Sequence, residues 1–325
     1  MISFQLDRPW WPLEAGWRGE VIFSITSWVM FRIFFSDYSG CRNQVKGENM
    51  TASALQTPVP ELGRLLKHWR QVQGMSQLDL ALEAGISARH LSFIETGRSQ
   101  PSREMVLRLA ETLELPLRER NRLLGAAGFS AAYRARSLDD AQFDKVRAAL
   151  DFMLQKQEPY PALVMNRSFD VLMINQAGAK MLGALGLAPP EGAGPPNTLR
   201  LMLHPDGLRP VTRDWERAAG HLIERAHRQL KGAADNDPLR QLLAEVLSYP
   251  GVPESFAIEN PSADALPVLP LEFELGGKVL SWITTVASFG TPQDVTAEEI
   301  MVESFFPADA ATEELIRALM AAAGE

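Results

Sequence analysis

The chain contains 325 residues, of which 46% are hydrophobic and 22% charged, and a single cysteine, Cys41. This length and composition are typical of a globular protein of two domains, and one cysteine excludes a disulfide framework and every zinc site built on several cysteines. The net charge of −8 is unevenly spread: residues 61–136 carry 12 Lys and Arg against 8 Asp and Glu, net +4, whereas residues 137–325 carry 15 against 27, net −12. We therefore expect any contact with nucleic acid in residues 61–136, with the acidic remainder kept away from DNA.

Residues 1–49 differ in character from the rest of the chain. The apolar run VIFSITSWVMF (21–31) is interrupted by Arg32, so it is shorter than the about 20 apolar residues of a membrane-spanning helix. No small-residue cleavage site of a signal peptide follows it. We predict no stable membrane insertion and interpret residues 1–49 as an upstream or unstructured extension ahead of a natural start at Met50. A membrane-associated anchor is the alternative, and residues 50–60 form a flexible lead-in on either interpretation.

Two short helices follow a first amphipathic helix predicted at 61–72. Ser76 caps the first of them, and Gly85 ends it where a left-handed conformation is needed. Ser87 caps the second, whose inward residues are Leu91 and Ile94. Helices this short are not stable alone, and two of them joined by a turn that contains glycine are typical of the DNA-binding helix-turn-helix.

The outward face of the second helix carries the residues that would read DNA. Arg89 lies in its first turn, where an arginine can bind the O6 and N7 atoms of guanine. Ser92 and Phe93 share this face, and an exposed Phe suits the methyl group of thymine. Helical spacing alone leaves open a helical hairpin with no role in nucleic-acid binding.

The segments MSQLDLALEAGIS (75–87) and RHLSFIETGRSQPS (89–102) resemble the XRE class of helix-turn-helix regulators. The resemblance covers about residues 60–128 and implies an all-α, five-helix lambda-repressor-like fold. It implies that Gln77, Arg98 and Ser99 contact phosphates without reading sequence, although a solvated loop cation is the alternative for Arg98. Arg70 and Glu95 fall on the family's internal ion pair. The complete set of expected DNA-binding residues is Gln77, Ser87, Ala88, Arg89, Ser92, Phe93, Arg98 and Ser99.

The second domain is predicted at 140–325, after two further helices that start near residues 103 and 118 and a linker at 129–139 with exposed Tyr133, Arg134 and Arg136. Its first helix, at 140–156, turns Leu150 and Met153 inward. Alternating polarity in LPLEFEL (269–275), the Gly276-Gly277 turn and the strand 278–289 predict a hairpin. The other expected elements are strands at 161–166, 169–175 and within 298–306, helices at 176–183, from 212 and from 238, and a last helix capped by Thr312. This pattern predicts an α+β fold with an antiparallel sheet.

The segments HPDGLRP (204–210), DW (214–215), FGTPQDV (289–295) and ESFFPAD (303–309) resemble the MmyB-like ligand-binding domain that follows an XRE-type helix-turn-helix. The resemblance covers about residues 140–320, and residues 161–183 are similar to the opening of a PAS domain. It implies a PAS-like fold that senses a small, mostly apolar ligand, with fatty acids the attested type. Asp214 stands where the family usually has Asn, which puts a ligand role for that position in doubt.

For a fatty-acid ligand, the expected polar anchors are His204 and Arg209, both in the HPDGLRP segment. The alternative for His204 is an ordinary surface histidine. The expected apolar lining of the ligand site is Trp215, Leu222, Phe273 and Trp282. Core packing is the alternative for the two tryptophans.

No catalytic motif is present: the sequence contains no G-x-S-x-G elbow, no P-loop and no G-x-G-x-x-G after a strand. His221 and His227 are six residues apart and fall on different faces of a helix, so they make a poor metal pair. We expect no enzyme activity, no metal and no cofactor. The predicted protein is a cytoplasmic, homodimeric, DNA-binding transcription regulator that senses a small apolar ligand. The alternative is a DNA-binding adaptor or antitoxin-like protein whose C-terminal domain binds a protein partner.

Overall fold

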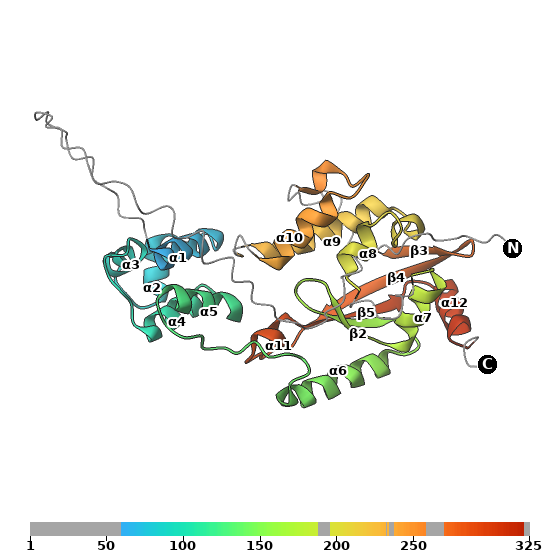
Figure 1. The fold of residues 1–325 in the computed structure, drawn as a ribbon, viewed down its shortest axis with the longest axis horizontal. Coiled ribbons are helices and arrows are strands. Elements are labelled where there is room, and N and C mark those ends of the chain that lie inside the picture. The colour runs from blue at the N-terminus through green and yellow to red at the C-terminus, as the bar shows by residue number, and fades with distance from the viewer. Residues whose placement is uncertain (1–59, 188–195, 232, 234–236, 258–269, 322–325) are drawn as a thin grey trace, which may run out of the picture. The chain divides into compact units, whose positions relative to one another are not determined.

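The computed structural model describes residues 60–187, 196–231, 233, 237–257 and 270–321 (Figure 1). The predictions for residues 1–59, including the start at Met50, lie outside these residues. Within the described part of the chain, no helix is long and apolar enough to cross a membrane.

Five short helices form the N-terminal part of the described chain. They are α1 (Glu61–Val72), α2 (Gln77–Glu83), α3 (Ala88–Glu95), α4 (Arg103–Thr112) and α5 (Leu117–Ala126). The hydroxyl of Ser76 accepts a hydrogen bond from the Asp79 amide (3.2 Å), and the Asp79 carboxylate accepts one from the Ser76 amide (2.8 Å). Ser87 caps α3 through the His90 amide (3.1 Å). Both caps satisfy amides that have no partner within their helix.

The five helices enclose one apolar core. Leu66, Leu80 and Leu91 have no exposed surface in this core, and each side chain of this kind contributes about 1.5–3 kcal/mol when it is removed from water. Gly63 brings α1 against the end of α3, because a Cβ atom there would lie 2.1 Å from the carbonyl oxygen of Glu95. The close approach of these two helices therefore requires glycine at this position.

The C-terminal part combines a five-stranded sheet with helices. Its strands are β1 (Ala162–Met165), β2 (Val171–Ile174), β3 (Leu271–Leu275), β4 (Lys278–Ala287) and β5 (Met301–Pro307). Its helices are α6 (Asp144–Gln157), α7 (Gln176–Ala184), α8 (Thr198–Leu203), α9 (Trp215–Leu230), α10 (Pro238–Leu247), α11 (Val295–Glu299) and α12 (Ala310–Ala321), with 3-10 turns η2 (Ala141–Phe143), η3 (Arg209–Val211) and η4 (Glu254–Ala257). The predicted α+β class is confirmed.

All strand pairs are antiparallel, in the order β2-β1-β5-β4-β3. The β3–β4 turn places Gly276 and Gly277 at φ +57° and +77°, as the hairpin prediction requires. Alternate residues of the strands face two different apolar clusters. One cluster joins the sheet to α8, α9 and α10, and the other joins it to α6. Figure 1 shows these helices on opposite sides of the sheet.

Four local predictions in this part were wrong. The long helix α9 begins at Trp215 rather than at Thr212, because Asp214 adopts a left-handed φ of +46°. On α6 the buried residue after Leu150 is Leu154, whereas Met153 is 39% exposed. The last helix begins at Ala310, and it is Asp309 that accepts a hydrogen bond from an amide of its first turn (2.7 Å).

The fourth wrong prediction concerns the linker, in which Arg134 is exposed but Tyr133 and Arg136 are half-buried. Arg136 is not an exposed linker residue, because its guanidinium forms a 2.7 Å ion pair with Asp294, just before α11, and its side chain is only 22% exposed. The hydroxyl of Thr296 also donates to the Arg136 carbonyl (2.6 Å).

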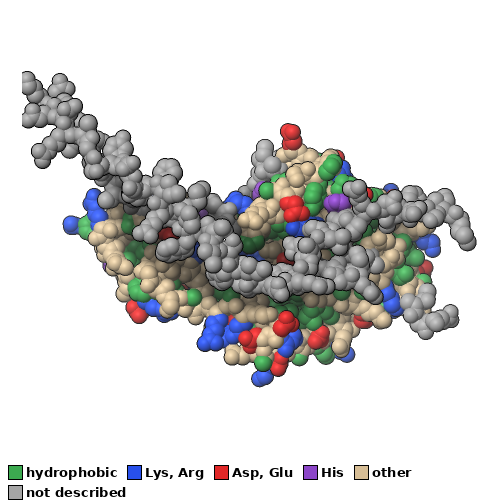
Figure 2. Space-filling view, viewed as in Figure 1, with side chains coloured by type: hydrophobic (Ala, Val, Ile, Leu, Met, Phe, Trp, Pro, Cys, Tyr) green, Lys and Arg blue, Asp and Glu red, His purple; other side chains and the backbone are tan. Residues whose placement is uncertain are grey.

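Charged side chains of both signs are interspersed over the described surface that Figure 2 shows.

Candidate DNA-reading helix and ligand cavity

Helix α3 presents the predicted reading residues away from the core. Leu91 and Ile94 are buried on its inner side, while Arg89 is exposed and Phe93 half-buried. The Arg89 guanidinium lies 5.3 Å from the centroid of the Phe93 ring. A guanidinium and an aromatic ring thus lie side by side on the outward face, where they could contact the edges of DNA bases.

A buried polar network lies behind this helix. Arg70 donates from Nε to Glu95 Oε1 (2.8 Å) and from a terminal nitrogen to Glu95 Oε2 (3.2 Å), so the expected internal ion pair is present. Gln77 donates its side-chain amide to Glu95 Oε2 (2.7 Å). The side chains of Arg70 and Glu95 are only 11% and 3% exposed. This network ties α1, the start of α2 and the end of α3 together.

The remaining predicted DNA contacts surround α3. The backbone amides of Arg98 and Ser99 both donate to the Phe93 carbonyl (2.8 and 3.2 Å), which turns the loop back against the helix. The Arg98 side chain is exposed there. Ser87 is the exposed cap of α3, and Ala88 and Ser92 are half-buried. Phosphate contact by Gln77, Arg98 and Ser99 stays a prediction.

A cavity of about 350 Å³ lies between the sheet and helices α7, α8 and α9. This volume falls within the usual range for small-molecule sites. Leu222 and Phe273, two of the predicted lining residues, face it. Its other apolar walls include Leu163, Val171, Ile174, Met181, Leu182, Leu201, Met202, Leu208, Ala218, Leu271 and Phe305.

The predicted polar anchors do not line this cavity. Arg209 donates to the carbonyls of Pro250 (2.6 Å) and Gly251 (2.9 Å), and its guanidinium stacks 4.1 Å from the centroid of the Trp215 ring. His204 packs edge-on against Tyr249, with ring centroids 5.1 Å apart. Both side chains instead attach the HPDGLRP segment to the residues that follow α10.

The two predicted tryptophans also lie outside the lining. Trp215 donates its indole nitrogen to the Met202 carbonyl (2.7 Å). Trp282 has no exposed surface and packs edge-on against Phe305, with ring centroids 6.2 Å apart. Trp282 is thus a core residue, and Trp215 is half-buried and packs against the same core.

Besides the titratable His221, the described residues with a charged side chain that line the cavity are Arg225 on α9 and Glu303 on β5. Their closest nitrogen and oxygen atoms are 3.9 Å apart, and the Arg225 guanidinium also lies 5.4 Å from the centroid of the Phe169 ring. Burial raises the pKa of Glu303, and Arg225 partly opposes this shift. Burial likewise lowers the pKa of Arg225.

The sequence contains a weak signal for both groups. Arg225 lies three residues after Leu222 on the same face of α9, and Glu303 is at an inward position of an alternating strand. The two positions face the same cavity because of the way α9 crosses the sheet. No local sequence pattern predicts that crossing.

Polar contacts connect the helix-turn-helix part of the chain to α11. The backbone amide of Leu117 in α5 donates to Glu298 (2.7 Å). Arg118 donates twice to Glu299, at 2.6 and 2.7 Å. Burial raises the pKa of Glu298, while the Leu117 amide lowers it.

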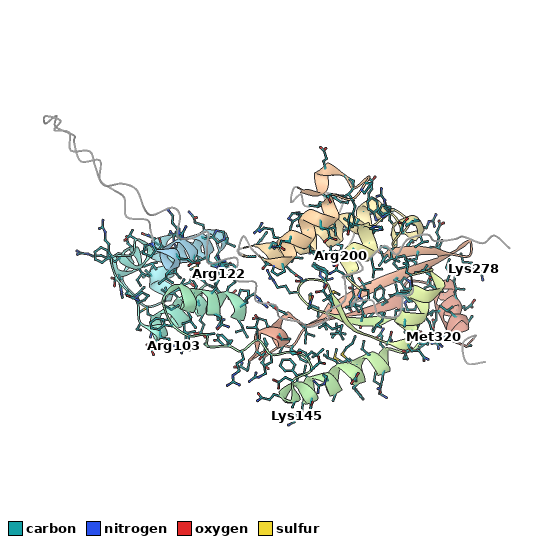
Figure 3. All side chains as sticks on the ribbon, viewed as in Figure 1. Arg103, Arg122, Lys145, Arg200, Lys278 and Met320 are labelled. Carbon is teal, nitrogen blue, oxygen red and sulfur yellow. The ribbon has the colours of Figure 1, made fainter. Side chains whose placement is uncertain are left out.

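Within the C-terminal part, Arg200 of α8 makes a bidentate pair with Glu245 of α10, at 2.8 and 2.7 Å. Figure 3 labels Arg200 near these helices.

Two family models match the chain. A helix-turn-helix domain matches residues 61–123, and the MmyB-like transcription regulator ligand binding domain matches residues 146–319, more than half of the chain. The chain belongs to the MmyB-like transcription regulators. A comparison with curated proteins gives no match.

As an MmyB-like regulator, the protein is a DNA-binding transcription regulator with a ligand-sensing domain. α3 belongs to the matched helix-turn-helix, and the cavity lies within the matched ligand-binding region. Among the described residues, no group of three or more His, Cys, Asp or Glu side chains could hold a metal ion.

Proposed function

We propose that this protein is a one-component cytoplasmic regulator of the XRE type, which binds duplex DNA as a homodimer through α3 and senses an acyl ligand in a PAS-like domain. The observation that carries the proposal is a single chain with an outward Arg89–Phe93 face on a helix-turn-helix and a mostly apolar cavity of about 350 Å³. A dimer is proposed because one small module seldom supplies enough affinity for specific binding.

The cavity walls support an acyl chain as the ligand. Leu, Ile, Val, Met and Phe side chains dominate them, and each buried CH₂ contributes about 0.8 kcal/mol. For a saturated chain of about a dozen carbons, the free energy gained from burial therefore offsets the translational, rotational and conformational entropy lost on binding. Fatty acids are the members of this class that we propose to test first.

The DNA part of the proposal predicts two different losses. Operators are first selected from random duplexes with the full chain. Arg89→Ala should then flatten base preference, because base-edge contacts specify sequence. Arg98→Ala should weaken binding to all sequences alike and reduce the slope of log affinity against log salt by about one, because it removes one phosphate contact. Equal loss of specificity from both variants would overturn this division of roles.

The sensing part is tested by titrating saturated fatty acids into delipidated full chain. Leu222→Trp fills the cavity and should abolish binding, whereas Ala149→Trp, on the exposed side of α6, should leave it intact. Organic extraction of freshly purified protein should yield an acyl compound. An obligate protein partner without any bound acyl compound would favour the adaptor alternative, and we propose no catalytic activity in either case.

A further inference from the structure

The cavity places one carboxyl group opposite one guanidinium in apolar surroundings. Glu303 projects from β5, where its neighbours across the sheet are Leu163 of β1 and Val286 of β4. Neither neighbour carries a charge. The closest nitrogen of Arg225 lies 3.9 Å from Glu303, and the side chains of the two residues are only 19% and 16% exposed.

Helix α9 carries three further titratable or charged groups near this pair, His221, Glu224 and Arg228. His221 lines the cavity one turn before Arg225 and lies 3.6 Å from Glu224. Arg228, which is not among the residues that line the cavity, also pairs with Glu224 (3.2 Å). Glu303 is therefore the one carboxyl group among the described residues that line the cavity.

A contact of 3.9 Å is too long for a hydrogen bond. Arg225 otherwise donates to the sulfur of Met301 (3.2 Å), a weak acceptor. The guanidinium thus keeps strong donor capacity for a ligand. With both groups charged, however, the pair is already neutral, and a ligand carboxylate would add a second negative charge beside Glu303. Like charges at such a distance favour protonation of one carboxyl group.

Building on the function proposed above, we propose that this cavity binds a carboxylate-headed acyl ligand together with one proton, with the carboxylate on Arg225 and the proton on Glu303. Glu303 then becomes a neutral donor that can share a hydrogen bond with the ligand, as protonated carboxyl groups do. An alkyl ligand with an uncharged hydroxyl head needs no such proton, since it leaves the charges of the Arg225–Glu303 pair balanced.

The sign of the pH dependence follows from this linkage. The burial that raises the pKa of Glu303 favours the form that a carboxylate ligand requires. Below the pKa of Glu303 in the ligand-free protein, the affinity for a carboxylate is constant. Above it, the affinity falls by about tenfold per pH unit, because each binding event then takes up one proton. Both statements apply above about pH 6, where the carboxyl group of a free fatty acid is itself ionised.

The test uses dodecanoate and dodecan-1-ol, which share one chain length and differ in the charge of the head. Both are titrated calorimetrically into delipidated full chain from about pH 6 to about pH 10, above the ordinary carboxyl pKa of about 4.3. Two buffers of different ionisation enthalpy give the number of protons taken up, a readout that requires no variant. Dodecanoate affinity should fall with pH while dodecan-1-ol affinity stays level.

Glu303→Gln tests the residue assignment. Its dodecanoate affinity should be independent of pH and at least as high as that of the wild type at the acidic end, because Gln cannot become charged. Glu274→Gln is the matched control: it lies on β3, is 59% exposed and pairs with Arg213 outside the cavity, so it should behave as the wild type.

The outcomes are distinct. A wild-type dodecanoate affinity that does not change with pH, or a pH dependence that persists in Glu303→Gln, would overturn the inference and leave the sensor intact. Binding of dodecan-1-ol without any binding of dodecanoate would do the same. If neither compound binds at any pH, the proposed acyl sensor itself fails.

Discussion

Replacing Glu95 by Ala should destabilise the helix-turn-helix before it affects any DNA contact. The substitution leaves the Arg70 guanidinium, whose side chain is 11% exposed, with the Met75 carbonyl (2.9 Å) as its remaining acceptor. It also removes the acceptor of the Gln77 side-chain amide. An uncompensated buried cation is therefore the main cost.

The magnitude follows from the burial of the pair. Breaking a buried ion pair by removing one partner costs about 3–5 kcal/mol, against about 0–1 kcal/mol for an exposed pair. We expect about 3 kcal/mol for Glu95→Ala, since the Met75 carbonyl still accepts one of the Arg70 hydrogens. At roughly 4–8 °C per kcal/mol for a domain of this size, the transition of the helix-turn-helix should fall by on the order of 15 °C.

Calorimetry of the full chain measures this transition, and fluorescence anisotropy at low temperature measures DNA binding separately. In the double variant Arg70→Met with Glu95→Leu, most of the lost stability should return, because apolar residues of similar size replace a buried pair at little cost. Unchanged melting of Glu95→Ala together with lost DNA binding would refute the reasoning, since Glu95 would then act at the DNA interface.

Two further predictions concern packing and titration. Gly63→Ala should lower the free energy of unfolding in urea by about 1–3 kcal/mol or more, because its Cβ would lie 2.1 Å from a backbone oxygen. Gly125→Ala, whose Cβ would have no atom within 4 Å, should be neutral or stabilising. Equal effects of the two substitutions would contradict the packing of α1 on α3. Burial and the hydrogen bond to Glu245 raise the pKa of Tyr249 to about 12, so its contribution to stability is complete below the unfolded value of about 10 and is lost as the pH rises from there towards 12. Tyr249→Phe should therefore flatten the alkaline loss of stability, and an unchanged alkaline profile would contradict this assignment.

The features that could be predicted from sequence are those decided within a few residues. The Ser76 and Ser87 caps, the Gly276-Gly277 hairpin and the inward side of α3 each follow from local backbone requirements. The Arg70–Glu95 pair is the exception, because its two residues lie on different helices. The resemblance to a known family, rather than any local pattern, supplied that pair.

The ligand anchors show the opposite case. Arg209 was a reasonable anchor by residue type, but its donors are taken by two backbone carbonyls after α10. These two carbonyls lie about 40 residues away along the chain, so no local sequence pattern predicts that they take up the Arg209 donors. Arg225 and Glu303 come together only because α9 crosses β5, and a charged residue on an amphipathic helix is most often solvated.

One segment connects the cavity to the helix-turn-helix part of the chain. α11 ends at Glu299, and β5 begins two residues later and carries Glu303 into the cavity. On its other side, α11 accepts hydrogen bonds from Leu117 and Arg118 of α5. A ligand that binds two arrangements of β5 unequally would therefore change the contacts of α5 as well, and coupling between the two sites would be reciprocal.

This connection leads to a prediction for Arg118→Ala. Its side chain is 49% exposed, so the loss of the pair should cost little stability, and neither DNA nor ligand affinity alone should change. The effect of saturating dodecanoate on DNA affinity should shrink from a coupling that is typically about 5–150-fold. Arg108→Ala, which removes an exposed charge from α4, should retain the full effect. Anisotropy titrations of operator DNA with and without dodecanoate measure both variants. Arg118→Ala removes both hydrogen bonds to Glu299 of α11. If dodecanoate still changes the DNA affinity of this variant as it does that of the wild type, the coupling does not pass through α11.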